Sequence, residues 1–117
     1  MADRRRVFKV GERVREIIAH ELNRLSDPRF ELVTISSVMT TRDLKMAKVY
    51  WLTYGGKERI EEISEAFESA TGVFRSAVGK ALKLRYAPEL KFFYDDTLDE
   101  QERVDRLFMK LNNPDQS

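Results

Sequence analysis

The longest regular pattern in the sequence is a run of apolar residues at helical spacing between Ile60 and Leu82. Continued as one helix to the next turn signal, it would span about 28 residues, which is long for a small globular chain. The triplet Ala70-Thr71-Gly72 lies near its middle, and threonine and glycine are weak helix formers. The pattern therefore predicts two helices joined at a kink formed by these three residues.

The remainder of the chain alternates between helical and strand patterns. An amphipathic stripe predicts a first helix over 10–25, and a second stripe predicts a final helix over 98–112, capped by Thr97 or Asp99. Runs of β-branched and aromatic residues predict strands over 33–39, 47–54 and 90–94, of which the first two form an antiparallel hairpin. The order α-β-β-α-kink-α-β-α predicts an α+β fold with helices packed on one face of a three-stranded sheet.

Length and composition restrict the class of protein. A chain of 117 residues, 42% of them apolar, is long enough for one domain with a hydrophobic core. We expect a single domain over 1–117, with its core over about 6–96. The absence of cysteine excludes disulfides and cysteine-ligated metals. No apolar run approaches the ~18 residues of a membrane span, so we expect a cytoplasmic protein with no membrane contact.

The net charge of +1 conceals a separation of charge along the chain. Basic residues dominate 1–16 and 75–91, whereas acidic residues dominate 58–68 and 95–105. This distribution predicts a molecule with a positive and a negative side, the first suited to an anionic partner and the second to a protein partner.

The basic segment 75–85 has the most informative pattern. At about 100° per residue, Arg75, Lys80 and Lys83 fall on one side of a helix together with Ser76 and Gly79. Cations that displace counterions, beside a glycine that permits close approach, would suit a phosphate backbone. The alternative is a solvated basic face with an incidental glycine.

Aromatic residues gather on the second and third predicted strands. Because side chains alternate between the two faces of a strand, some of these rings fill the core and others face away from the helices. Rings of the second kind could stack on unpaired bases. The set consists of Tyr50, Trp51, Tyr54, Phe92, Phe93 and Tyr94.

Two features that suggest chemistry have simpler explanations. Acidic residues over 95–100 resemble a magnesium-binding array, but acids in the first turn of a helix offset its dipole. His20 has no serine or aspartate at a motif spacing, and no phosphate-binding loop or zinc motif occurs. We expect no catalytic residue, no metal and no cofactor.

Several segments, taken in order, resemble one family within the type II KH fold, the bacterial ribosome-binding factor A family. The resemblance covers about residues 5–112, and an Ala-x-Gly kink replaces the Gly-x-x-Gly loop of other KH domains. The matching segments are Asp27-Pro28-Arg29, Thr41-Arg42-Asp43-Leu44, Ala47-Lys48-Val49-Tyr50, Ala70-Thr71-Gly72-Val73-Phe74-Arg75-Ser76, Gly79-Lys80-Ala81-Leu82-Lys83-Leu84-Arg85 and Pro88-Glu89-Leu90-Lys91-Phe92-Phe93-Tyr94-Asp95.

The resemblance implies a monomeric, non-catalytic assembly factor that binds the free 30S subunit through 16S rRNA. It would assist late subunit maturation and 16S rRNA processing, most of all in the cold, with a ribosome-maturation GTPase as a candidate for its release. Two alternatives remain open: a KH-like reader of single-stranded RNA, and a protein–protein adapter that uses an acidic face.

Charge and resemblance together select candidate rRNA contacts. The first group is Arg75, Lys80, Lys83, Arg85, Arg4, Arg5, Arg6, Lys9 and Arg13. A second group, near the hairpin or in family segments, is Arg29, Arg42, Lys45 and Lys48.

Overall fold

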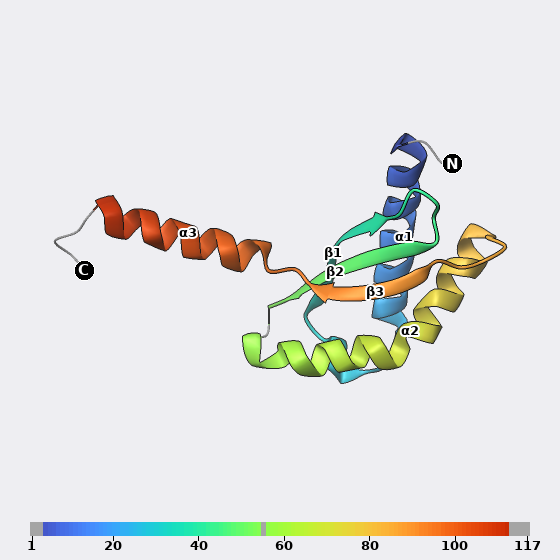
Figure 1. The fold of residues 1–117 in the computed structure, drawn as a ribbon. Helices are drawn as coiled ribbons and strands as arrows, with labels where there is room; N and C mark the ends of the chain where they lie inside the picture. Colours follow the sequence, from blue (N-terminus) through green and yellow to red (C-terminus); the bar gives the residue numbers. More distant parts are fainter. Residues whose placement is uncertain (1–3, 55, 113–117) are drawn as a thin grey trace.

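A computed structural model describes residues 4–54 and 56–112 (Figure 1). Its order of elements confirms the predicted α+β arrangement. The elements are α1 (Arg4–Arg24), the 3₁₀ turn η1 (Pro28–Phe30), β1 (Val33–Thr40), β2 (Met46–Thr53), the 3₁₀ turn η2 (Lys57–Arg59), α2 (Ile60–Leu82), β3 (Glu89–Tyr94) and α3 (Thr97–Asn112).

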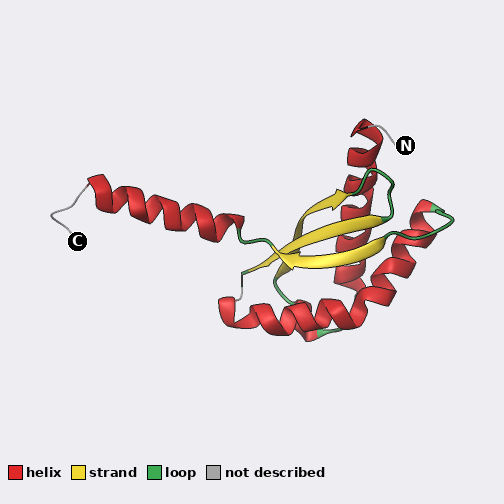
Figure 2. Cartoon of the chain, in the orientation of Figure 1, coloured by secondary structure: helices red, strands yellow, loops and turns green. Residues whose placement is uncertain are grey.

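The three strands form one sheet in the order β1-β2-β3 (Figure 2). β1 pairs antiparallel with β2, as the hairpin prediction requires, and a register shift lies between Ile35 and Ser37. β3 pairs parallel with β2. Parallel neighbours need a long crossover, and α2 supplies it.

The core lies between one face of the sheet and the helices α1 and α2. Ala47, Val49 and Trp51 alternate along β2 and are fully buried. The Phe67 ring of α2 lies 4.7 Å from Phe92 and 5.6 Å from Trp51, measured between centroids. Burying rings of this size supplies much of the hydrophobic stabilisation of a small domain.

Close packing of α1 on β1 depends on a glycine. A Cβ placed on Gly11 would lie 3.0 Å from the carbonyl oxygen of Val38, so a larger residue would push α1 away from the sheet. The Thr40 hydroxyl at the end of β1 donates to the carbonyl of Val7 at 3.0 Å. These contacts hold the first turns of α1 beside the hairpin.

The predicted break between two helices is instead a bend within one continuous helix, α2. Figure 1 shows α2 changing direction midway along its length, where its colour turns from yellow-green to yellow. The Thr71 hydroxyl donates to the carbonyl of Phe67 at 2.9 Å. Such back-bonding to the fourth preceding residue bends helices, so the kink triplet acts through Thr71.

Glycine roles in α2 differ from the sequence-based interpretation. Gly72 has no positive φ, and a Cβ placed there would meet nothing within 4 Å. A Cβ on Gly79 would lie 3.2 Å from the Cβ of Ala87. The close approach that Gly79 permits is therefore made by the loop before β3, whereas Gly72 has open space around it.

We accordingly expect Gly72→Ala to raise the free energy of unfolding by about 0.5–1 kcal/mol, since alanine is the better helix former. Gly79→Val should lower the free energy of unfolding by about 1–3 kcal/mol, because it crowds Ala87. Urea denaturation of both variants measures the difference. Equal stabilities would contradict the packing of α2 on this loop.

The last helix, α3, leads away from the sheet and makes the molecule elongated, with extents of 62 × 36 × 17 Å (Figure 1). None of its described residues is buried, and its apolar residues, Leu107 and Phe108 among them, are exposed. The predicted caps are wrong: α3 begins at Thr97, whose backbone N–H donates to the Asp95 carboxylate at 3.0 Å.

Hydrogen bonds fix the start of α3. The Tyr94 hydroxyl donates to Asp99 at 2.6 Å, and this bond raises the pKa of Tyr94 to about 12. The Asp95 carboxylate accepts from Thr97 and, at 2.7 Å, from the hydroxyl of Ser36. These bonds hold the pKa of Asp95 below its usual range.

Ending the chain after Asp96 should therefore change stability little. The truncation removes no buried residue. It costs the Tyr94–Asp99 hydrogen bond, worth about 1–2 kcal/mol, and the bonds from Thr97 to the Asp95 carboxylate, which water can replace because that contact is exposed. Thermal and urea unfolding of the shortened chain test this. A loss of more than about 4 kcal/mol would mean that α3 packs on the sheet in solution.

Candidate nucleic-acid interface

The basic residues at the end of α2 surround a shallow hollow. Arg75 and Lys80 reach it from α2, and Arg85 reaches it from the loop that follows, beside Tyr86 and Ala87. A guanidinium N–H of Arg75 donates to the carbonyl of Ala87 at 3.0 Å. The guanidinium of Arg85 lies 5.4 Å from the centre of the Tyr86 ring. The structure thus brings three of the predicted contacts together.

Lys83 departs from its predicted position. α2 ends at Leu82, and Lys83 is the C-cap residue, with a left-handed backbone at φ 53°. Its N–H and that of Leu84 both bond to the carbonyl of Gly79, which closes the helix. The angular position computed for a continuing helix therefore does not apply, although the side chain of Lys83 is exposed.

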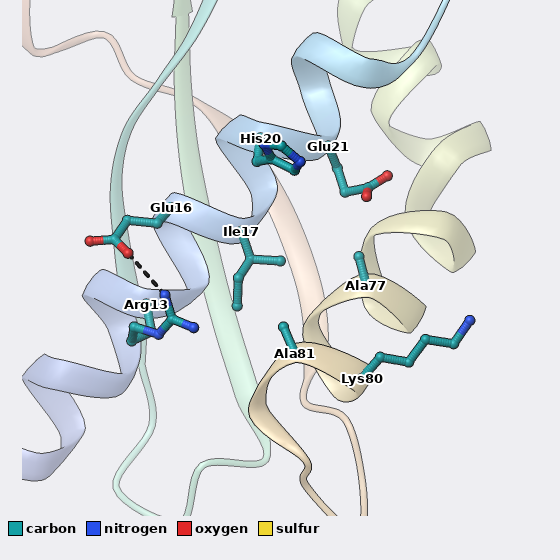
Figure 3. Close-up of a pocket in the computed structure, with 8 residues that line it drawn as sticks. All are labelled: Arg13, Glu16, Ile17, His20, Glu21, Ala77, Lys80 and Ala81. Atoms are coloured by element: carbon teal, nitrogen blue, oxygen red, sulfur yellow. Dashed lines mark hydrogen bonds and ion pairs between the residues drawn. The ribbon is translucent and has the colours of Figure 1, made fainter.

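A second groove, of about 510 Å³, separates α1 from α2 (Figure 3). Lys80 lines it from α2, while Arg13 and His20 line it from α1. Arg13 is paired with Glu16 at 3.1 Å, with both side chains more than half exposed. Lys80 therefore borders both hollows and joins the cations of the two helices.

Glu21 lies in the same groove and was not a predicted site residue. One carboxylate oxygen is 3.3 Å from Nε of Arg24. The other, Oε2, is buried without a hydrogen-bond partner among the described residues. A carboxylate among cations repels phosphate but accepts hydrogen bonds from base amino groups. No sequence pattern singled out Glu21, because its position in the groove depends on how α1 and α2 pack together.

The hairpin continues the basic surface. Lys45 borders a hollow together with Arg75 and Arg85, and the acids Asp43 and Glu89 lie at its rim. Asp43 accepts bonds from the Thr41 hydroxyl and the Lys45 backbone N–H, which hold its pKa below the usual range. This Asx turn shapes the loop that presents Lys45.

Residues from the start of α1 lie at the same end of the sheet as the hairpin (Figure 1). This group comprises Arg4, Arg5, Arg6 and Lys9, all exposed. Arg42, also exposed, lies in the hairpin loop between β1 and β2. Most of the predicted contacts therefore lie at the end of the molecule that carries the start of α1, the hairpin loop and the C-terminus of α2.

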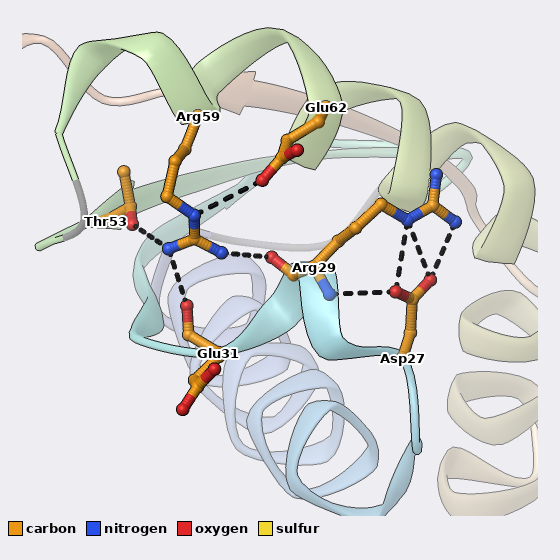
Figure 4. Close-up of polar contacts among 6 residues, drawn as sticks. All are labelled: Asp27, Arg29, Glu31, Thr53, Arg59 and Glu62. Carbon is orange, nitrogen blue, oxygen red and sulfur yellow. Dashed lines mark hydrogen bonds and ion pairs between the residues drawn. The ribbon is translucent and has the colours of Figure 1, made fainter.

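Two predicted contacts lie elsewhere. Lys48 lies on β2 and is exposed, between buried Ala47 and Val49, so it points to the face opposite the helices. Arg29, in η1, forms a bidentate pair with Asp27, with its closest contact at 2.7 Å (Figure 4). The pair lowers the pKa of Asp27 and raises that of Arg29. We infer a structural role for Arg29.

Arg59, which the sequence analysis did not select, joins three segments (Figure 4). Its guanidinium donates to the carbonyls of Glu31 at 2.9 Å and Arg29 at 2.8 Å. It also donates to the Thr53 hydroxyl at 3.2 Å and pairs with Glu62 at 3.3 Å. Arg59 thereby ties η1 to the end of β2 and the start of α2.

Across 4–54 and 56–112, no three histidine, cysteine or acidic side chains are grouped to hold a metal ion. His20 is exposed on α1. Likewise, no helix within these residues has the length and apolar character to cross a membrane.

Comparison with known sequences gives a consistent result. The sequence model of the family described as Ribosome-binding factor A matches residues 6–108. The Ribosome-binding factor A of Desulfatibacillum aliphaticivorans is 37% identical over 101 residues, covering 86% of this chain and 82% of its own. That of Staphylococcus carnosus is 32% identical and covers 94% of this chain and 96% of its own.

Solved structures show the same fold. The solution structure of a Thermotoga maritima protein, described as a putative ribosome binding factor A, has a TM-score of 0.71 at 32% identity, covering 80% of this chain and 90% of its own. A homology model of the Thermus thermophilus ribosome binding factor A, fitted into a cryo-EM map of its complex with the 30S subunit, has a TM-score of 0.62 at 24% identity, covering 73% of this chain and 90% of its own.

Proposed function

Because the chain belongs to the ribosome-binding factor A family, we propose that it binds the free 30S subunit through 16S rRNA. In this role it assists late maturation of the small subunit and processing of 16S rRNA. The relative from Thermus thermophilus that was fitted into a 30S complex supports this assignment.

One observation carries the proposal: cations from α2, its following loop and the hairpin meet on one side of the molecule. Arg75, Lys80, Arg85 and Lys45 are all exposed, and none of them forms an ion pair with a described carboxylate. Unpaired cations gathered over several elements suit a phosphate backbone, whose counterions they replace. We therefore assign rRNA contact to this basic surface, defined as Lys45, Arg75, Lys80, Lys83 and Arg85.

The proposal extends to the mode of action. The protein acts as a cytoplasmic monomer without catalysis or cofactor, favouring a correct rRNA fold, and a ribosome-maturation GTPase releases it. The residues over about 6–96 form the KH-like body that docks on the subunit, within one domain over 1–117. Its loss harms growth most in the cold, where misfolded rRNA rearranges slowly.

Sedimentation through sucrose gradients at several KCl concentrations tests this function. We expect the protein to travel with free 30S particles and not with 70S ribosomes. If three to five cations contact phosphates, the log–log slope of affinity against salt should be about −2 to −4. Absence from the 30S fraction would overturn the proposal, and a flat salt response would favour a ribosomal protein as the contact.

A further inference from the structure

No helix among the described residues lies over one face of the sheet. Because Ala47, Val49 and Trp51 point into the core, Lys48, Tyr50 and Leu52 point to the opposite face. α1 and α2 pack on the core side, and α3 leads away from the sheet without burying a residue (Figure 2). We call this surface the open face.

Strand register places two aromatic rings together at its centre. Tyr50 is the register partner of Phe93, and their ring centroids lie 5.7 Å apart with an interplanar angle of 32°. Phe93 is 41% exposed, and Tyr50 is half-buried. The core is already filled by Trp51 and Phe92 on the other face. This outward pair is therefore not required for core packing.

Two lysines lie beside the rings. Lys48 and Lys91 are register partners on neighbouring strands, one step of about 7 Å along the sheet from Tyr50 and Phe93. Like charges directly opposite each other destabilise a sheet. Neither lysine forms an ion pair with any described carboxylate, although Glu89 lies one step further along β3. An anionic ligand would offset this repulsion.

We propose that the open face binds a single-stranded RNA segment, with unpaired bases stacked on Tyr50 and Phe93 and phosphates against Lys48 and Lys91. Exposed rings beside cations are the arrangement that single-strand binders use, whereas the bases of a duplex are already stacked on one another. This inference rests on the proposed function, and assigns the unpaired part of the rRNA to the open face and phosphate contact to the basic surface.

The test replaces the rings and keeps the fold. In the full chain, Tyr50→Leu with Phe93→Leu retains apolar bulk but removes stacking. We expect this variant to bind a fluorescent oligouridine of about ten nucleotides at least tenfold more weakly than the wild type. Its binding to an RNA duplex should remain unchanged, and it should melt only a few degrees below the wild type, because one cross-strand ring pair is lost. A matched control, Val104→Leu with Phe108→Leu, alters exposed apolar residues of α3 and should bind normally.

Ultraviolet crosslinking locates the contact directly. In the isolated protein, oligouridine should crosslink to the tryptic peptides that contain Tyr50 and Phe93. In the 30S complex, the rRNA itself should crosslink to the same two peptides. If the double leucine variant binds the oligonucleotide as tightly as the wild type, or if neither of these peptides crosslinks to RNA, the inference is overturned.

The design separates this inference from the proposed function. Wild-type protein that sediments with 30S particles, while the leucine variant keeps its oligonucleotide affinity, leaves the function intact and removes the open-face site. Wild-type protein that binds oligouridine through the open face but never sediments with 30S particles supports the site and removes the function.

Discussion

Replacing Lys80, Lys83 and Arg85 together by glutamine should weaken 30S binding by about a hundredfold near 0.1 M salt. Each lost phosphate contact reduces the salt slope by roughly 0.7–0.9, and three such contacts account for this factor. The three side chains are exposed and form no ion pair with a described residue, so each change should alter folding stability by less than about 0.5 kcal/mol. Filter binding over a range of KCl concentrations measures both affinity and slope.

A variant of equal charge provides the control. Arg103, Arg106 and Lys110 are exposed cations of α3, distant from the basic surface (Figure 1). Changing these three to glutamine lowers the net charge by the same amount and retains good helix formers. We expect nearly unchanged 30S affinity. An equal loss in both variants would show that net charge, and not the basic surface, drives binding.

The largest stability effect of a polar substitution is expected at Arg59. Arg59→Ala should lower the free energy of unfolding by about 2–3 kcal/mol, because it removes four charge-assisted contacts from a side chain that is only 20% exposed. The carbonyls of Arg29 and Glu31 would lose their donor, and the junction of η1 with α2 would loosen. Urea denaturation followed by circular dichroism measures the change.

Two further variants test why Arg59 stabilises the fold. Arg103→Ala breaks an ion pair with Glu100 in which both side chains are more than half exposed, and should cost less than about 0.5 kcal/mol. Arg59→Lys keeps the charge but cannot direct donors to several carbonyls at once, so it should recover less than half of the loss. Full recovery by lysine would mean that charge alone matters at this site.

Local patterns predicted the elements of this fold well. α1 and the hairpin follow from apolar residues at helical spacing and from β-branched runs. The two hairpin strands agree with their predicted bounds within one residue, whereas α1 ends one residue early and begins six residues before its predicted start. The kink triplet was also identified, because Thr71 and Gly72 interrupt a strong helical pattern. These signals come from neighbouring residues, and a single sequence therefore contains them.

Helical spacing predicted the relative positions of candidate residues within α2, but not beyond the end of that helix. Arg75 and Lys80 share one hollow, as their helical spacing indicated. Lys83 does not, because the chain leaves the helix there with a left-handed lysine, a position at which glycine would have signalled the end. Lys45 joined the surface only because the hairpin packs near the end of α2.

The sequence by itself determined the order of elements, the alternation of each strand and the family. The tertiary structure alone decided which face of the sheet is covered, and hence that Trp51 is buried while Tyr50 and Phe93 face outward. It also decided that Gly79 packs closely against Ala87 of the loop before β3. Alternation states which residues share a face, but the docking of α1 and α2 selects the buried one, and that docking depends on contacts between residues far apart in the chain.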